Sequence, residues 1–204
     1  MCPRATAAQP GLRERKKVQT RKAIRKAAYR LFADDGYDAT TVDRIAAEAD
    51  VSPSTVFRYF PTKEDIVLTD EYDDGMLDAL RNRPAGEPPL DALRAVMRET
   101  LAVVLADPAE RAELVQRQIL MRDVPAIRSR SQESMIATGR QLGAVIADRT
   151  GRPAGDQEVR VFTAAVFGAL HETIMYWTDT GLGNDDLLPL MDRAFDVLAG
   201  GLRL

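Results

Sequence analysis

Residues 36–67 read GYDATTVDRIAAEADVSPSTVFRYFPTKEDIV, and this stretch decides the fold. Thr41 is an N-cap residue before a helix that carries Val42, Ile45 and Ala46 on one face. Ser52 followed by Pro53 marks the start of a second short helix, because proline at the first helical position has no N–H to leave unsatisfied. Two short helices joined by a tight turn at 49–51 predict a helix-turn-helix over about residues 41–60.

The second helix of this pair has a distinctive N-terminal end. Pro53, Ser54 and Thr55 are small or polar, so this end is narrow enough to enter the major groove of DNA. The hydroxyl groups of Ser54 and Thr55 can donate to or accept from base edges. Val56 and Phe60, further along, are expected to be core residues.

The sequence on either side extends the helical pattern. Ile24, Ala27, Ala28, Leu31 and Phe32 repeat with the spacing of one helix face, and Gly36 is placed to end that helix in a left-handed conformation. On the other side, Thr62 and Asp65 resemble a capping box for a fourth helix, expected to run to about Leu80 with Gly75 as a weak point.

At these residues the chain resembles the DNA-binding domain of the TetR family of bacterial transcriptional regulators. The resemblance covers about the first third of the chain and is carried by the following positions: Phe32, Gly36, Tyr37, Thr40, Thr41, Ile45, Ala46, Val51, Ser52, Thr55, Tyr59, Phe60 and Lys63. The rest of the chain fits this family by its length and helicity.

The resemblance implies a set of DNA contacts. Thr41 and Lys63 are expected to bind phosphates, Lys63 with help from a helix dipole. Pro53, Ser54 and Thr55 are expected to face base edges, and Tyr59 to touch the DNA backbone. Candidate DNA-binding residues are therefore Thr41, Arg44, Pro53, Ser54, Thr55, Phe57, Arg58, Tyr59 and Lys63.

Several positions leave alternatives open. Members of the family often have tyrosine where this chain has Phe57, so Phe57 lacks a phenolic hydrogen bond and, like Tyr37, is as readily a packing residue as a DNA contact. Asp50 stands where glycine is usual, and we expect the turn to survive because Asp tolerates the left-handed region. Arg58 is expected to read guanine or to bind a phosphate. Ser52 is more readily a cap than a base reader.

The charge distribution supports a polyanion-binding end. Residues 1–63 hold 13 Lys+Arg and 7 Asp+Glu, a balance of +6, while residues 64–204 hold 15 and 24, a balance of −9. A basic end on an acidic body fits a nucleic-acid-binding domain, whereas a solvated helix face is the alternative. Arg13, Arg15, Lys16 and Lys17 begin the first helix or form a mobile basic arm, and either arrangement attracts phosphates without specificity.

The whole chain is predicted to be all-α, with about nine helices and no strand. We expect a flexible tail over residues 1–11, a three-helix DNA-binding domain over 12–62, and a larger helical domain for effector binding and dimerisation over 63–204. After the fourth helix, a loop at 81–89 precedes helices over about 90–106, 108–121, 124–149 and 156–178, and Asn184 is expected to cap the last helix.

The helix over 156–178 is apolar nearly all round and has a patch of small residues, so it is expected to pair with the last helix in a dimer. A buried helix of a monomer is the alternative. The candidate interface residues are Phe162, Ala165, Gly168, Ala169, Leu187, Met191 and Phe195.

The sequence indicates a ligand pocket in the larger domain less clearly than it indicates the DNA-binding domain. Its candidate residues are Met97, Arg117, Gln118, Met121, Phe167, His171 and Trp177. Cys2 and His171 are the only cysteine and histidine, so we expect no disulfide, no metal site and no cofactor.

These features predict a sequence-specific DNA-binding regulator: a homodimeric repressor that a small, partly apolar effector releases from double-stranded operator DNA. A transcriptional activator or a ligand-independent regulator of the same fold is the nearest alternative. An enzyme with a DNA-binding-like head is more distant, because the chain has no nucleophile elbow, phosphate loop or metal cluster. No signal peptide or membrane span is expected, which favours a cytoplasmic protein associated with the nucleoid.

Overall fold

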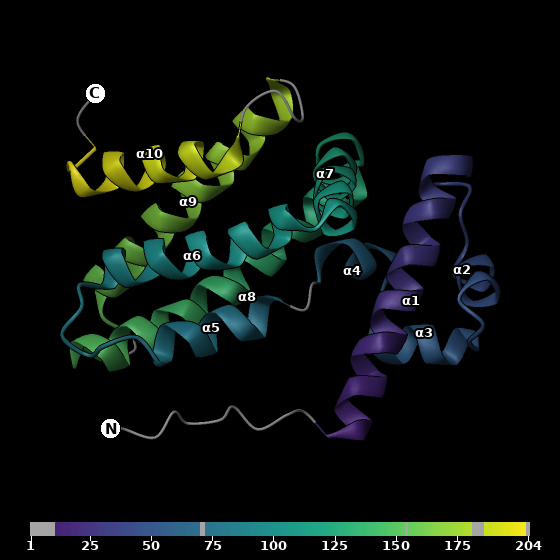
Figure 1. Cartoon of the computed structure of the whole chain (residues 1–204), viewed down its shortest axis with the longest axis horizontal. Coiled ribbons are helices and arrows are strands. Elements are labelled where there is room, and N and C mark those ends of the chain that lie inside the picture. Colours follow the sequence, from purple (N-terminus) through teal and green to yellow (C-terminus); the bar gives the residue numbers. More distant parts are fainter. Residues whose placement is uncertain (1–10, 70–71, 154, 181–185, 203–204) are drawn as a thin grey trace. The chain divides into compact units, whose positions relative to one another are not determined.

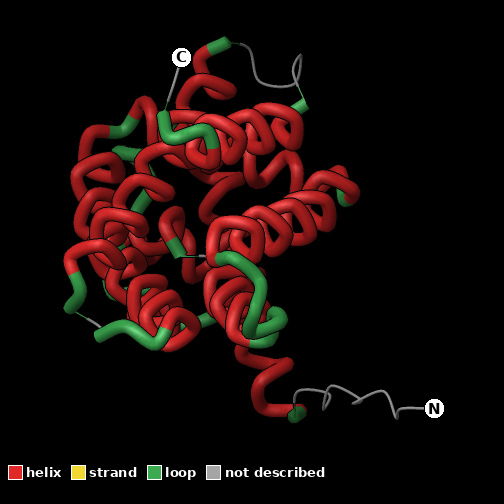
Figure 2. Tube along the Cα trace, turned by 90° about the vertical axis from the view of Figure 1, so that its left-hand side faces the viewer, coloured by secondary structure: helices red, strands yellow, loops and turns green. Residues whose placement is uncertain are grey.

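The computed structural model describes residues 11–69, 72–153, 155–180 and 186–202, and every regular element within them is an α-helix (Figures 1 and 2). The all-α prediction is thus confirmed for this part of the chain. The described segments contain ten helices where about nine were expected. The expected tail lies outside the described residues except for Gly11, which precedes the first helix.

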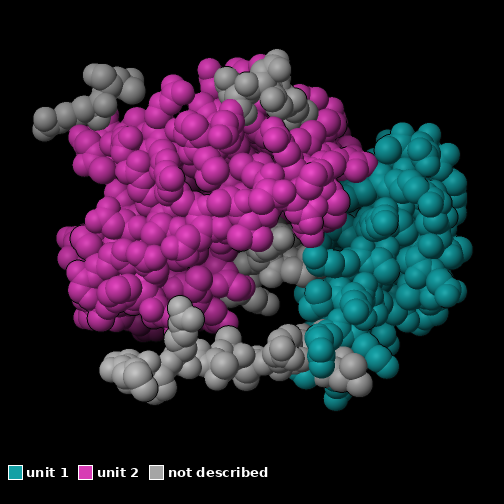
Figure 3. Space-filling model, in the orientation of Figure 1, with its two compact units in different colours: residues 1–66 teal, residues 67–204 magenta. Residues whose placement is uncertain are grey.

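The chain divides into two compact units, residues 1–66 and 67–204 (Figure 3). Unit 1 contains α1 (Leu12–Asp35), α2 (Val42–Glu48), α3 (Pro53–Tyr59) and the start of α4 (Lys63–Leu68). Helix α4 crosses the boundary, since its last two residues belong to unit 2.

The core of unit 1 explains why three short helices hold together. Ile24 and Ala28 of α1, Ile45 of α2, Val56 of α3 and the adjacent Phe60 are each almost fully buried. Burying a large apolar side chain contributes about 1.5–3 kcal/mol, and this set therefore provides most of what fixes α2 and α3 against α1. As expected, Gly36 directly follows the last residue of α1. Its φ of 86° is positive, but its ψ of 160° places it outside the left-handed helical region that was expected, in a conformation open to glycine at no steric cost.

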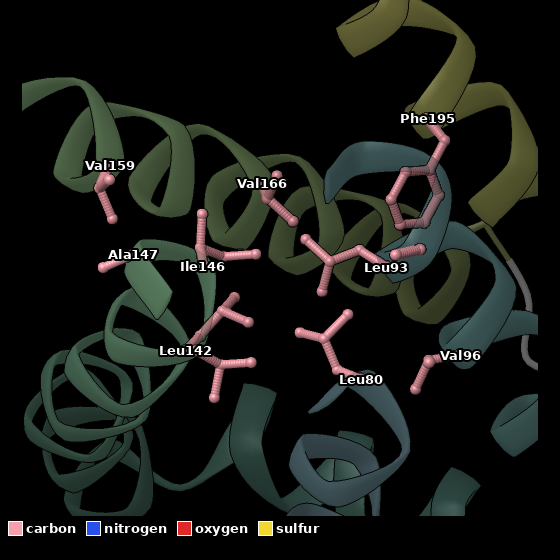
Figure 4. Close-up of a cluster of buried hydrophobic side chains, with 11 residues drawn as sticks. Leu80, Leu93, Val96, Leu142, Ile146, Ala147, Val159, Val166 and Phe195 are labelled. Atoms are coloured by element: carbon pink, nitrogen blue, oxygen red, sulfur yellow. The ribbon is translucent and has the colours of Figure 1, made fainter. Parts of the chain in front are cut away.

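Unit 2 is built from six further helices: α5 (Tyr72–Arg81), α6 (Pro89–Ala106), α7 (Pro108–Asp123), α8 (Pro125–Thr150), α9 (Gln157–Asp179) and α10 (Leu187–Ala199). Helix α9 packs against both α8 and α10. Figure 4 shows how Leu80 of α5, Leu93 of α6, Ile146 of α8, Val166 of α9 and Phe195 of α10 meet in one buried cluster.

The prediction for the fourth helix was wrong. One helix to Leu80 was expected, with its weak point at Gly75, whereas α4 ends at Leu68 and α5 begins at Tyr72. The carbonyl of Leu68 accepts a hydrogen bond from Arg117 Nη2 at 3.1 Å instead of continuing a helical ladder. A contact from α7, 49 residues away, is invisible to local periodicity.

The cap of the last helix also differs from the expectation. Asn184 lies outside the described residues, and the N-cap of α10 is Asp186, whose carboxylate accepts from the Leu188 N–H at 3.3 Å. By contrast, the capping box of α4 is present as predicted. The Thr62 N–H donates to Asp65 Oδ2 at 3.1 Å, and the Asp65 N–H donates to Thr62 Oγ1 at 3.2 Å.

Candidate DNA-binding surface and ligand cavity

The N-terminal end of α3 is an exposed cluster of hydroxyl groups. Ser52 caps the helix by accepting from the Thr55 N–H at 3.2 Å, and its Oγ lies 2.9 Å from both Ser54 Oγ and Thr55 Oγ1. Pro53 and Ser54 are exposed and Thr55 is half-buried. Ser52 is therefore a cap, and it orients the two hydroxyl groups that are proposed to reach base edges.

The turn before α3 is tight and uses a left-handed residue. Asp50 has a φ of 53°, and the Val51 N–H donates to the Ala46 carbonyl at 3.0 Å. Asp thus takes the conformation expected of it in a position where glycine is usual. The turn joins α2 directly to the N-cap of α3.

The rest of α3 separates into a buried and an exposed side. Val56 is buried, as predicted, whereas Phe57 is 52% exposed and Arg58 is exposed. The Arg58 guanidinium lies 5.2 Å from the ring centroid of half-buried Tyr59. Phe57 is therefore a surface residue next to the hydroxyl cluster and not part of the core.

Helix α2 presents two further candidates. Thr41 is an exposed N-cap residue that accepts from the Arg44 N–H at 3.3 Å. The Arg44 Nη2 atom donates to Asp35 Oδ2 at 2.7 Å, which ties its guanidinium to the end of α1. A phosphate contact by Arg44 would therefore compete with Asp35.

Lys63 is held by the loop between α1 and α2. Its Nζ donates to the carbonyl oxygens of Tyr37, at 2.8 Å, and Thr40, at 3.1 Å, and lies 3.9 Å from the Tyr37 ring centroid. Lys63 thus fixes the segment from which α2 starts. This role was not expected from the sequence, which assigned Lys63 to a phosphate alone.

Tyr37 is a packing residue. It is buried, and its phenolic OH donates to Glu64 Oε1 at 2.7 Å. Burial, together with this hydrogen bond, raises the pKa of Tyr37 far above its usual value. Burial also acts to raise the pKa of Glu64, but the hydrogen bond from Tyr37, with smaller contributions from the backbone, Thr62 and Lys63, leaves that pKa lowered.

The basic cluster of α1 is helical from its first residue. Arg13, Arg15, Lys16 and Lys17 lie in its first two turns with their side chains exposed. Of the two arrangements left open by the sequence, a helix start and a mobile arm, the structure has the helix.

Unit 2 encloses a cavity of about 300 Å³, the main cavity, whose walls are predominantly apolar. Six of the seven residues expected in a pocket line it: Met97, Arg117, Gln118, Met121, Phe167 and His171. Met76, Met135 and Met191, which come from three other helices, also line it and were not predicted as pocket residues.

Trp177 is the exception among the expected pocket residues. Its side chain is 1% exposed and packs against Leu101, Leu187 and Met191, which line the cavity, whereas Trp177 itself is not among the lining residues. The error has a physical reason, because periodicity places Trp177 on the inner side of α9 but cannot tell a cavity wall from filled core.

Two polar side chains of α7 meet the main cavity. Gln118 is 4% exposed, and its Oε1 has no hydrogen-bond partner among the described residues. The neighbouring Arg117 donates to the carbonyl of Leu68, as described above. A second cavity of about 160 Å³ shares Met121, Met135 and His171 with the first.

The expected dimer residues fall into two groups. Leu187, Met191 and Phe195 are at most 3% exposed and belong to the core of unit 2, so the structure does not present them at a surface. Helix α10 packs its apolar side against α6 and α9. The apolar residues that suggested a dimer interface are therefore buried within unit 2.

The α9 residues are more accessible. Gly168 is exposed, while Phe162, Ala165 and Ala169 are half-buried. Val161 and Tyr176, which were not predicted, are 60% and 52% exposed on the same helix. Together with Ala164, Gly168 and the exposed carboxylate of Glu172, these two residues form an exposed surface on which apolar and small side chains predominate, here called the α9 face.

Comparisons with known proteins agree on one family. A family model described as bacterial regulatory proteins of the tetR family matches residues 24–69, and a model described as the MftR C-terminal domain matches residues 87–203. The HTH-type transcriptional regulator TcmR of Streptomyces glaucescens is 35% identical over 205 residues, which cover 98% of this chain and 90% of that protein. The HTH-type transcriptional repressor KstR of Rhodococcus jostii (strain RHA1) is 28% identical over 107 residues, about half of each chain.

Solved structures share the fold. The fatty acid degradation regulator FadR of Bacillus halodurans superposes with a TM-score of 0.59 at 25% identity, covering 90% of this chain and 96% of that one. The transcriptional regulator FadR of Bacillus subtilis, solved in complex with stearoyl-CoA, has a TM-score of 0.60 at 22% identity, covering 89% and 99%. In the described part of this chain, no helix combines the length and apolar character needed to cross a membrane.

Proposed function

Because the chain belongs to the tetR family of bacterial regulatory proteins, we propose that it binds an operator as a homodimer and leaves it when a small molecule fills the main cavity. One observation carries this proposal. A single chain combines an exposed, hydroxyl-bearing end of α3 in unit 1 with an apolar cavity in unit 2. The exposed end of α3 is suited to contact bases in a DNA groove, and the apolar cavity is suited to bind an apolar effector.

The hydroxyl cluster of α3 is proposed to read base edges. Pro53 and Ser54 protrude at the helix end, and the Thr55 hydroxyl is held beside them by Ser52. Hydroxyl groups donate and accept, and the Thr methyl suits contact with a thymine methyl. Phe57, exposed on the next turn, is proposed to contact a methyl group or a sugar.

Phosphate contacts are proposed for the residues around this end. Thr41 at the start of α2, Arg58, Tyr59 and the exposed cations at the start of α1 supply hydroxyl groups and positive charge. Phosphate contacts set orientation and affinity, whereas base contacts set sequence preference. Arg44 and Lys63 are assigned a secondary part in affinity because both are already bound within unit 1.

Dimerisation is proposed to use the α9 face. Val161 and Tyr176 expose large apolar surfaces, and Ala164 and Gly168 between them allow close approach of a second helix. A two-fold dimer would present two copies of α3 to successive major grooves, which lie about 34–36 Å apart.

Release is proposed to pass through α7 and α4. Gln118 lines the cavity, and its neighbour Arg117 holds the carbonyl of Leu68, the last residue of α4. Because α4 is one helix whose first four residues belong to unit 1, a shift of Arg117 on ligand binding would be passed to α4.

The experiment is selection of DNA by the full-length protein from a random-sequence library. A repressor of this kind is expected to enrich a two-fold symmetric sequence and to bind it as two chains per duplex. Enrichment of no sequence, or of an asymmetric site bound by one chain, would contradict the proposal. Compounds that lower the affinity for the enriched sequence then define the effector.

A further inference from the structure

Gln118 lines the main cavity and has a buried side-chain oxygen without a hydrogen-bond donor among the described residues. Gln118 is 4% exposed, and its Oε1 accepts no hydrogen bond from the described residues. Burying a carbonyl oxygen without a donor is unfavourable, because the hydrogen bonds that it made to water are lost and not replaced. A ligand in the cavity that offers an O–H or N–H to Gln118 Oε1 would remove this cost.

The charges of the cavity wall restrict the charge of a ligand that could donate a hydrogen bond to Gln118 Oε1. The described lining residues include Arg117 and His171, and no aspartate or glutamate is among the side chains that the structure describes there. Among these described residues a cationic ligand would have no carboxylate to pair with, and burying an unpaired charge is strongly unfavourable. A ligand carboxylate, when ionised, has no hydrogen to donate to Gln118. A neutral hydroxyl or N–H group carries no charge that needs a partner and still has a hydrogen to donate to Gln118.

The apolar wall indicates the body of the ligand. Five methionines line the cavity, one from each of α5 to α8 and one from α10: Met76, Met97, Met121, Met135 and Met191. Methionine side chains are unbranched and adapt to irregular shapes, and their sulfur atoms make favourable contacts with aromatic rings. With Phe167 beside them, they form a wall suited to a flat ring system.

We propose that the main cavity takes a neutral, largely apolar aromatic molecule with a hydroxyl group, which donates its hydrogen to Gln118 Oε1. The inference deepens the proposed function, since it names the chemical class of the effector. Gln118 is then the residue that selects hydroxylated molecules over hydrocarbons of the same shape, because leaving its oxygen unpaired beside a hydrocarbon keeps the penalty.

The test uses four two-ring probes with the full-length protein in the absence of DNA: 2-naphthol, naphthalene, 2-naphthoate and 2-naphthylmethylammonium. Isothermal titration calorimetry measures each dissociation constant. We expect 2-naphthol to bind roughly ten-fold more tightly than naphthalene, as one hydrogen bond to a buried acceptor would give. The ammonium probe is expected to bind most weakly.

Two variants locate the preference. Gln118→Leu should bind naphthalene at least as tightly as 2-naphthol, because the polar atom is gone. Gln132→Leu is the matched control, since Gln132 lines only the second cavity, and it should keep the wild-type preference. Circular dichroism checks that both variants are folded.

The comparison of probes on the wild-type protein needs no variant and decides the inference by itself. Equal affinity for naphthalene and 2-naphthol, tighter binding of the carboxylate or ammonium probe, or binding of none of the four would overturn it. A preference kept by folded Gln118→Leu would also overturn it. Because DNA is absent, these outcomes are separate from release of the operator, which tests the proposed function.

Discussion

At the scale of single residues, Lys63 shows how a candidate contact can also be a structural residue. Its ammonium group bridges the carbonyl oxygens of Tyr37 and Thr40, two residues of the loop that leads into α2. The position of Thr41, and with it the start of α2, therefore depends on a side chain from α4. A lysine at this position affects DNA binding through the shape of unit 1 as well as through its charge.

Replacing Lys63 by alanine is expected to lower the free energy of unfolding by about 1–3 kcal/mol, because two hydrogen bonds from a charged donor are lost. Affinity should fall for operator and random DNA alike. Urea denaturation measures the first effect and fluorescence anisotropy the second. Lys26→Ala, which removes an exposed lysine of α1, is the control and should leave stability unchanged. An unaltered urea midpoint for Lys63→Ala would refute the structural role.

The hydrogen bond from Tyr37 to Glu64 gives a pH-dependent contribution to stability. The folded-state pKa of Glu64 lies below the ordinary value of a glutamate: burial raises this pKa, and the bond from Tyr37 and the other hydrogen bonds outweigh that effect. A group whose pKa is lower in the folded state stabilises the fold above its unfolded pKa, and this stabilisation is lost as the pH falls through the folded pKa.

Tyr37→Phe should therefore destabilise the protein by about 0.5–1.5 kcal/mol at pH 7. The difference from wild type should shrink as the pH falls below the ordinary pKa of a glutamate and through the lowered folded-state pKa of Glu64, where its carboxylate becomes protonated. Urea unfolding of both proteins at a series of pH values measures this difference. If it stayed constant down to pH 3, Glu64 would not be the partner that matters.

At the scale of the elements, local patterns predicted most helices and the turns that join them. Proline at the start of a helix, the Thr62–Asp65 capping box and Gly36 act within a few residues of themselves, so they could be read from the sequence. The end of α4 could not be read in this way, and the last carbonyl of this helix accepts a hydrogen bond from Arg117 of a helix distant in sequence. The hydroxyl groups at the N-terminal end of α3 were predictable because they depend on neighbouring residues. The hydrogen bonds of Lys63 and the packing of Trp177 involve residues distant in sequence and were not predictable.

The contact between α7 and α4 gives a prediction about coupling. Arg117→Met removes the hydrogen bond to the Leu68 carbonyl while keeping an apolar stem at the cavity wall. The variant should still bind the effector, but saturating effector should weaken its DNA binding less than in the wild type. The ratio of DNA dissociation constants with and without effector is the coupling to be measured.

A matched control lies on the same helix. Arg111 is exposed near the start of α7 and is not among the residues that line the cavity, so Arg111→Met should keep the wild-type ratio. If Arg117→Met had the same ratio of DNA dissociation constants with and without effector as the wild type, coupling through α4 would be ruled out.

At the scale of the whole molecule, the charge of the chain changes sign along its length. Residues 1–63 carry a balance of +6 and residues 64–204 one of −9. At physiological salt, charges further away than about 8 Å are screened, so the local charge of the DNA-binding end decides its attraction to phosphates. An acidic remainder then limits unspecific attachment of the rest of the protein to DNA.

The α9 face carries the prediction about assembly. A Cβ atom at Gly168 would meet nothing within 4 Å, so Gly168→Arg should be tolerated by the single chain but place a charge in the centre of the proposed interface. Light scattering should find monomers, and operator affinity should fall sharply. Ala112→Arg, at an exposed site on α7, should remain dimeric. A soluble Gly168→Arg dimer with normal DNA binding would rule out this interface.

The most direct measurement is the ratio of affinities for the selected operator and for scrambled DNA of the same length. Ser54→Ala and Thr55→Ala should each reduce this discrimination by about 1–3 kcal/mol if the lost hydroxyl makes a good base contact. Lys63→Ala should leave the ratio near its wild-type value while weakening both affinities. Unchanged ratios for both hydroxyl variants, or a ratio that only Lys63→Ala lowers, would contradict the claim that the N-terminal end of α3 reads the sequence.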